Sequence, residues 1–225
     1  MTGPLARTVA PRRPAGRADR VRNRAKILQA ARSAFCAQGT EAPLDPIARA
    51  AGVGNATLYR HFPTRDTLVR GVCLAAAERI AEEGGAALAQ EEDAFAALHR
   101  FALGAAREGI GMLCLMVPEE RWLADPDLLS ARQQVDDVAL TAVHRAQRAG
   151  RMRTDVGAGD LMVALGQLSR PLPGHVAGDR PGLLLERHVQ LFLAALRTGT
   201  PPAAPPPAPD HPLPGRAITL SDIRH

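Results

Sequence analysis

Apolar residues recur every three or four positions along most of this chain, and glycines or prolines separate the runs. Within residues 20–38, four of them fall on one helical face: Ile27, Ala31, Ala34 and Phe35. Apolar positions at this spacing are typical of an amphipathic helix that packs on a core. Gly39 follows, and glycine is the usual residue just beyond a helix. The pattern therefore predicts a first helix over about residues 20–38.

Two shorter helices are predicted within residues 44–65, on either side of a glycine turn. Asp45 is a good N-cap for the first, and Pro46 suits the first helical position, where its missing N–H leaves no hydrogen bond unmade. Gly52 ends that helix, and Pro63 stops the second because a residue before proline avoids the α region. Helices joined in this way form the helix-turn-helix plan, whose second helix enters the major groove of DNA. The alternative is a plain helical hairpin with a polar, solvated face.

The second of these short helices carries side chains that suit contacts with DNA. Its outward residues offer amide, hydroxyl, guanidinium and imidazole groups, which can reach phosphates and base edges. They are Asn55, Thr57, Tyr59, Arg60 and His61, with Ala56 between them and Arg65 just beyond the helix. The small side chain of Ala56 allows the backbone to approach DNA closely.

Residues 51–69, AGVGNATLYRHFPTRDTLV, resemble the DNA-reading signature of the tetracycline-repressor (TetR) family. The resemblance implies two sets of contacts: phosphates for Thr57, Tyr59 and Arg65, and base edges for Asn55, Ala56 and His61. It also implies a homodimer that binds double-stranded DNA at a palindromic operator and encloses an effector pocket in its second domain. The family often has a Ser or Thr that caps the first short helix and touches a phosphate. Here Ala42 and Pro43 stand near that position, so Asp45 takes over the capping.

Positive charge is concentrated at the N-terminus. The whole chain has a formal net charge of +5, but residues 1–26 contain eight basic residues against Asp19 alone, a balance of +7. The remaining residues therefore carry −2. A basic arm attached to a slightly acidic body is typical of proteins that bind nucleic acid. Proline, glycine, alanine and arginine dominate the arm, which predicts disorder away from DNA.

Composition favours an all-α chain with a substantial core. Apolar residues make up 46% of the 225 residues and aromatic residues only 3%, so the core must be aliphatic and rich in alanine. Such a composition favours helices over sheets. We expect about nine helices in two domains, a three-helix DNA-binding domain followed by a helical ligand-binding and dimerisation domain. The expected divisions are a disordered basic arm at 1–19, a helix-turn-helix domain at 20–66, an effector-binding and dimerisation domain at 67–199, and a disordered proline-rich tail at 200–225.

Capping patterns mark the helices of the second domain. Thr64 is a good N-cap for a helix that the pair Gly84–Gly85 should end. Asp125 followed by a proline opens a long helix that runs to Gly150. Two more helices are expected, one at about 160–170 and one that Asp179 caps and Gly199 ends.

The last helix is apolar on more than one side. Such a helix must be buried on more than one side, and a terminal helix in a chain of this size rarely finds that cover within one subunit. Twofold homodimers are the commonest oligomers, so we expect a partner subunit to supply the cover. The interface candidates are Leu184, Leu191 and Phe192.

Residues 110–124 are strongly apolar, but the segment is short and Pro118 breaks it. Methionine side chains adapt their shape, and a nearby aromatic ring and titratable group suit a pocket for an apolar ligand. The candidate lining of a small-molecule effector pocket is Phe101, Met112, Met116, Trp122 and His144. The alternative is that these are ordinary core residues.

Motifs for catalysis, metal binding or cofactor binding are missing from the sequence. Its cysteines are far apart, its histidines lack ligand spacing, and its adjacent acidic residues do not face one another on a helix. No apolar run is long enough to span a membrane. We therefore expect no cofactor and no catalytic residues, but a cytoplasmic DNA-binding transcriptional regulator, a repressor that a small molecule releases from its operator. The alternatives are a DNA-binding dimer without an effector and a small helical enzyme.

Overall fold

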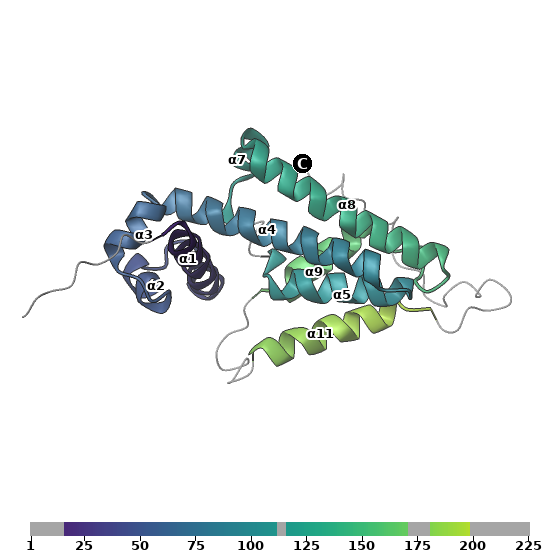
Figure 1. Ribbon diagram of the computed structural model, residues 1–225. Coiled ribbons are helices and arrows are strands. Elements are labelled where there is room, and N and C mark those ends of the chain that lie inside the picture. Colours follow the sequence, from purple (N-terminus) through teal and green to yellow (C-terminus); the bar gives the residue numbers. More distant parts are fainter. Residues whose placement is uncertain (1–15, 112–115, 171–180, 199–225) are drawn as a thin grey trace, which may run out of the picture.

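The computed structural model describes residues 16–111, 116–170 and 181–198, and these ranges contain nine helices (Figure 1). They are α1 (Arg17–Gln38), α2 (Leu44–Ala50), α3 (Asn55–His61), α4 (Arg65–Gln90), α5 (Ala94–Arg107), α7 (Glu119–Ala124), α8 (Pro126–Arg148), α9 (Ala158–Leu168) and α11 (Pro181–Leu196). The expectation of an all-α fold is confirmed for these residues, whose one β-type pairing is an isolated bridge between Met152 and Arg197. Most of the basic arm, the proline-rich tail, Met112, Asp179 and Gly199 lie outside the described residues.

Helices α1, α2 and α3 form a small bundle, which we call the head, at the left of Figure 1. Apolar side chains from all three helices are buried at its centre: Ile27, Ala31, Phe35, Ile47 and Leu58. The stripe predicted for the first helix is thus confirmed, with Ala34 half-buried at its edge. Helix α1 begins at Arg17, so the last three residues of the predicted arm are helical. Gly39 and Gly52, with φ of 80° and 67°, follow their helices in the backbone conformation that favours glycine.

The predicted start of α2 is wrong. The helix begins at Leu44, Pro43 occupies the N-cap in an extended conformation, and no side chain caps the helix. Leu44 is partly buried against the core, and this packing draws it into the helical turn. Asp45 therefore lies inside the first turn, where a carboxylate is still favourable beside the positive end of the helix dipole. Its side chain is left available for another partner.

Helix α4 runs without a break from the head into the rest of the chain (Figure 1). The prediction that Gly84–Gly85 would end it is wrong, because the helix continues to Gln90. A Cβ atom at Gly84 would lie 2.5 Å from Val138 Cγ1 and 2.8 Å from Phe101 Cδ2. The glycine therefore lets α8 and α5 pack closely on α4, and it serves packing rather than helix termination.

Helices α4, α5 and α8 pack against one another, and with α7, α9 and α11 they form what we call the body (Figure 1). Helix α11 covers α5, α9 contacts α5, α8 and α11, and α7 packs on α8. None of the described helices has the length and apolar character needed to cross a membrane. The predicted domain boundary after residue 66 stays a prediction, and it falls in the first turn of the unbroken helix α4.

Several helix starts of the body depend on side-chain hydrogen bonds, among them the start of α5, which Asp93 caps. Thr64 caps α4, and Asp125 accepts hydrogen bonds from two backbone N–H groups at the start of α8, with Pro126 as the first helical residue. These two predicted caps are confirmed. Helix α9 begins two residues before its predicted start, because Asp160 lies in its first turn and accepts a 2.8 Å bond from the Gly157 N–H.

Candidate nucleic-acid interface

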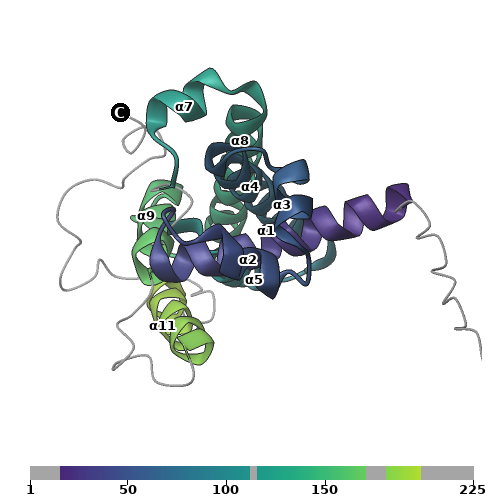
Figure 2. The same ribbon diagram turned by 90° about the vertical axis from the view of Figure 1, so that its left-hand side faces the viewer.

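Helix α3 buries one side and presents the other to solvent, at the end of the molecule that faces the viewer in Figure 2. Leu58 anchors it, with an exposed fraction of only 1%, while the Tyr59 side chain is 48% exposed. Asn55, Ala56 and Arg60 are also exposed, and Thr57 and His61 are half-buried. The predicted polar face therefore exists on this helix. Which of its side chains contact bases and which contact phosphates stays a prediction.

A hydrogen bond between two side chains joins α2 to α3. Asn55 Nδ2 donates to Asp45 Oδ1 at 2.8 Å. A carboxylate at neutral pH only accepts hydrogen bonds, so the amide nitrogen must point toward Asp45 and the amide oxygen must point elsewhere. This contact was not predicted, since the two residues are ten positions apart and lie on different helices.

Arg65 is held by the head's own backbone. Its Nη1 donates to the carbonyl oxygens of Thr40 at 2.5 Å and Ala42 at 2.7 Å, and the side chain is half-buried. The first residue of α4 is thereby tied to the link between α1 and α2. A guanidinium has five N–H donors, so these two bonds leave other donors for a phosphate. The phosphate contact stays a prediction, and the positioning contact is one that no local sequence pattern reveals.

Basic residues of α1 lie beside the end of α3. The Arg24 guanidinium stands 5.5 Å from the centre of the Phe62 ring. Partial burial lowers the pKa of His61, and the positive charges of Arg20, Arg24 and Arg60 lower that pKa further. The His61 ring is therefore a neutral group among cations at neutral pH. A surface with this charge favours a polyanion such as DNA.

The body places the predicted pocket residues in different environments. Phe101, Met116 and Trp122 are buried, while Met112 lies outside the described residues. His144 is exposed in the single chain, and its place in the pocket lining stays a prediction. The buried positions of α8 next to it are Ala142, Val143 and Ala146, and this register leaves His144 on the outer face.

The last helix, α11, has an inner and an outer apolar side. Val189, Leu193 and Leu196 are buried, and the partly buried Phe192 packs against the same core. Leu191 is 56% exposed in the single chain. Of the three interface candidates, Leu191 is therefore the most exposed, while Leu184 and Phe192 are half-buried.

In the part of the chain that the structure describes, no three His, Cys, Asp or Glu residues gather closely enough to hold a metal ion.

Comparison with known proteins agrees with the polar face that the head presents to solvent. The family described as "Bacterial regulatory proteins, tetR family" matches residues 27–72, which include α2 and α3. A TetR transcription regulatory protein from Mycobacterium vanbaalenii is 31% identical, with 81% of this chain and 99% of that chain covered and a TM-score of 0.52. The TetR transcriptional regulator SCO0520 from Streptomyces coelicolor is 27% identical, with coverages of 79% and 99% and a TM-score of 0.57.

A third solved structure shares the fold at lower identity. It is the TetR-like transcriptional regulator LfrR from Mycobacterium smegmatis, solved in complex with proflavine. It is 22% identical, with 80% of this chain and 99% of that chain covered and a TM-score of 0.54. No curated protein matches the sequence.

Proposed function

We propose that this chain, which belongs to the TetR family of bacterial regulatory proteins, acts as a homodimeric repressor that a small molecule releases from its operator. As a member of that family it is a DNA-binding transcriptional regulator. The observation that carries the proposal is the polar face of α3, held on the head by buried Leu58 and flanked by the basic residues of α1. The proposed site of action is the cytoplasm, where the chromosome lies.

The proposed readout divides the outward residues of the head into two groups. Asn55, Ala56 and His61 face base edges in the major groove, where hydrogen-bonding groups specify sequence. The phosphate contacts, which fix position, come from Thr57, Tyr59, Arg60 and Arg65. Because Asp45 holds the Asn55 amide nitrogen, the Asn55 oxygen is the atom offered to a base, and it suits the exocyclic amino group of adenine or cytosine.

The proposed dimer uses the outer side of α11. Leu191 is exposed there although the same helix already packs its inner side on α5 and α9. A second copy related by a twofold axis would cover this side and present two heads to DNA. A symmetric dimer fits a palindromic operator whose half-site centres lie about one DNA turn, roughly 34–36 Å, or a multiple of it apart.

The proposed effector site lies in the body near Phe101, Met116 and Trp122, which are buried side chains with adaptable or aromatic groups. LfrR, which has the same fold, was solved with proflavine, and this supports a ligand of aromatic or cationic character. Ligand binding can release DNA only if the ligand has a higher affinity for the conformation that does not bind DNA. Because α4 is continuous, a shift of its body end moves the head.

The effector proposal can be tested with the fluorescence of Trp122, the only tryptophan in the chain. Full-length protein bound to its operator duplex is screened against aromatic and cationic compounds, with DNA release and Trp122 emission measured together. We expect the compounds that release DNA also to shift or quench the emission. Trp122→Phe should weaken that release more than it weakens DNA binding. Release without a change in emission would place the site elsewhere, and no release by any compound would favour the ligand-free dimer.

A further inference from the structure

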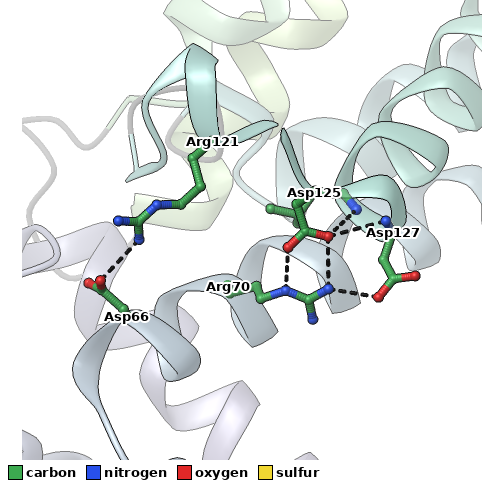
Figure 3. Close-up of polar contacts among 6 residues, drawn as sticks. Asp66, Arg70, Arg121, Asp125 and Asp127 are labelled. Atoms are coloured by element: carbon green, nitrogen blue, oxygen red, sulfur yellow. Dashed lines mark hydrogen bonds and ion pairs between the residues drawn. The ribbon is translucent and has the colours of Figure 1, made fainter. Parts of the chain in front are cut away.

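A cluster of charged side chains joins the start of α4 to the start of α8 (Figure 3). Arg70 of α4 donates to both carboxylate oxygens of Asp125, from Nε at 2.5 Å and from Nη2 at 2.8 Å. The same Nη2 donates to Asp127 Oδ2 at 2.7 Å. One helical turn earlier, Asp66 pairs with Arg121 of α7 at 3.1 Å. We call these five residues the latch.

The geometry of the latch is fixed from the α8 side. Asp125 is the N-cap of α8, and its Oδ1 also accepts from the backbone N–H groups of Asp127 at 3.1 Å and Leu128 at 3.3 Å. The carboxylate therefore cannot rotate to follow Arg70 without releasing the helix cap. The hydrogen bond from Arg70 is the main cause that lowers the pKa of Asp125, and the same bond raises the pKa of Arg70. A planar guanidinium paired in this two-point manner is directional as well as attractive.

The latch lies close to the head. Arg65, five residues before Arg70 on the same helix, holds the backbone carbonyls of Thr40 and Ala42. The first turns of α4 are thus fastened to the head by Arg65 and to α8 by Arg70. A stiff helical segment joins the two contacts, so the angle at which α4 leaves α8 also sets the direction of the head.

A second polar contact restrains the head from another side. Arg32 of α1 donates to the Arg107 carbonyl oxygen at the end of α5, at 2.8 Å. The adjacent Glu108 accepts from Arg79 of α4 at 2.5 Å and lies 3.7 Å from Arg32 Nε. The head is thus tied to α8 through the first turns of α4 and to the end of α5 through Arg32, so it is held in orientation as well as in position.

We propose that Arg70, Asp125 and Asp127 are positioning residues for operator binding, which set the angle between head and body and thereby the separation of the two recognition helices in the dimer. The inference rests on the proposed homodimer. The Arg70 and Asp125 side chains are 36% and 19% exposed, and an ion pair that keeps contact with solvent contributes little to stability. A small change in the angle between head and body still matters for DNA binding, because one base pair displaces a half-site by only about 3.4 Å.

The test compares spacing preference in four single variants and one double variant of the full-length protein. Arg70→Gln and Asp125→Asn remove the ion pair, and asparagine caps a helix about as well as aspartate, so the start of α8 is retained. Asp93→Asn is the matched control, since Asp93 caps α5 and pairs with Arg151 at 2.9 Å, away from the head. Asp127→Asn, at a residue whose side chain is 70% exposed, is a milder variant that leaves the Arg70–Asp125 pair in place.

The probes are the duplex that wild-type protein selects from random DNA, the same duplex with one base pair inserted between its half-sites, and a duplex with a single half-site. We expect the wild-type preference for the selected spacing to fall by about fivefold or more in Arg70→Gln and in Asp125→Asn. Single half-site affinity and thermal unfolding should stay close to those of Asp93→Asn, which keeps the wild-type preference. Asp127→Asn should lose less of the spacing preference than Arg70→Gln or Asp125→Asn. The double variant Arg70→Gln/Asp125→Asn should lose no more of the preference than Arg70→Gln alone, because that substitution already removes the contacts of Arg70 with both carboxylates.

Three results would overturn the inference while leaving the proposed function intact. The first is an unchanged spacing preference in Arg70→Gln and Asp125→Asn. The second is an equal loss of affinity for the single half-site duplex, and the third is the same loss of spacing preference in Asp93→Asn. A wild-type protein that selects no paired half-sites would instead overturn the proposed dimeric function, and the inference with it. The duplexes that wild-type protein selects thus distinguish the two failures.

Discussion

Asp45 on α2 accepts a 2.8 Å hydrogen bond from the side-chain amide of Asn55 on α3, the helix that carries the candidate base contacts. Both side chains are exposed, so the bond contributes little to the stability of the head. Its consequence is orientational, because it leaves the Asn55 oxygen free to face DNA.

The first prediction concerns base readout. Asn55→Ala should relax the preference at one or two base pairs, by about 1–3 kcal/mol at each. Asp45→Ala frees the amide to turn over, so the preference should broaden at the same base pairs while thermal unfolding stays near that of wild type. Affinities for a set of single-base operator variants measure both effects. Broadening at a different base pair in the two variants would contradict the proposed role of Asp45.

The second prediction separates the roles of Arg60 on α3 and Arg65 at the start of α4. Arg65→Ala leaves the carbonyls of Thr40 and Ala42 without their donor, so it should lower the stability by about 1.5–3 kcal/mol and weaken binding to every DNA sequence. Arg60 is exposed, and Arg60→Ala should leave stability unchanged while reducing the slope of log K against log salt by about one unit. Denaturant unfolding and salt titrations measure these quantities. Wild-type stability in Arg65→Ala with a reduced slope would mean that Arg65 serves only as a phosphate contact.

The third prediction compares adjacent glycines in the middle of α4. Gly84→Ala should destabilise the fold, because the new methyl group would meet Val138 and Phe101 at less than 3.0 Å. Gly85→Ala meets no atom within 4 Å and should be neutral or stabilising by up to about 1 kcal/mol, since alanine favours helix over glycine. Thermal unfolding of the two variants is the measurement. Equal shifts of the two midpoints would contradict the close packing at Gly84.

Helix α4 shows which features local sequence patterns predict and which they do not. The helix starts at Thr64 and Asp125 were predicted because a cap and its partners lie within a few residues of one another. Gly84 resembles a helix stop in the sequence, but the glycine is required by close contacts with α5 and α8, which no local pattern contains.

The candidate site also has some features that local sequence patterns predict and others that they do not. The polar face of α3 follows from helical spacing, so it could be predicted. The bond from Arg65 to Thr40 spans 25 positions and the Arg70–Asp125 pair spans 55, so neither has a local signature. The exposure of His144 has no local signature either, since the face of α8 that points inward depends on which helices pack against it.

The fourth prediction concerns assembly. Leu191→Glu places a carboxylate at a position that is exposed in the single chain, so it should cost little unless a partner covers that position. In the proposed dimer the charge would be buried without a partner, and the protein should dissociate into monomers. Leu123→Glu is the control, because Leu123 is 61% exposed on α7. Sedimentation at micromolar concentration should show dimers for wild type and for Leu123→Glu. A dimeric Leu191→Glu would move the interface elsewhere.

The fifth prediction tests the central claim, that the chain reads DNA as a symmetric dimer through α3. Full-length protein is used to select binding duplexes from a random library, and the enriched sequences are determined. We predict an inverted repeat whose half-site centres lie about 34–36 Å, or a multiple of that distance, apart. Asn55→Ala should weaken the enrichment at matching positions in both halves. A library without any enriched sequence, or with a single unpaired site that Asn55→Ala leaves unchanged, would contradict the account.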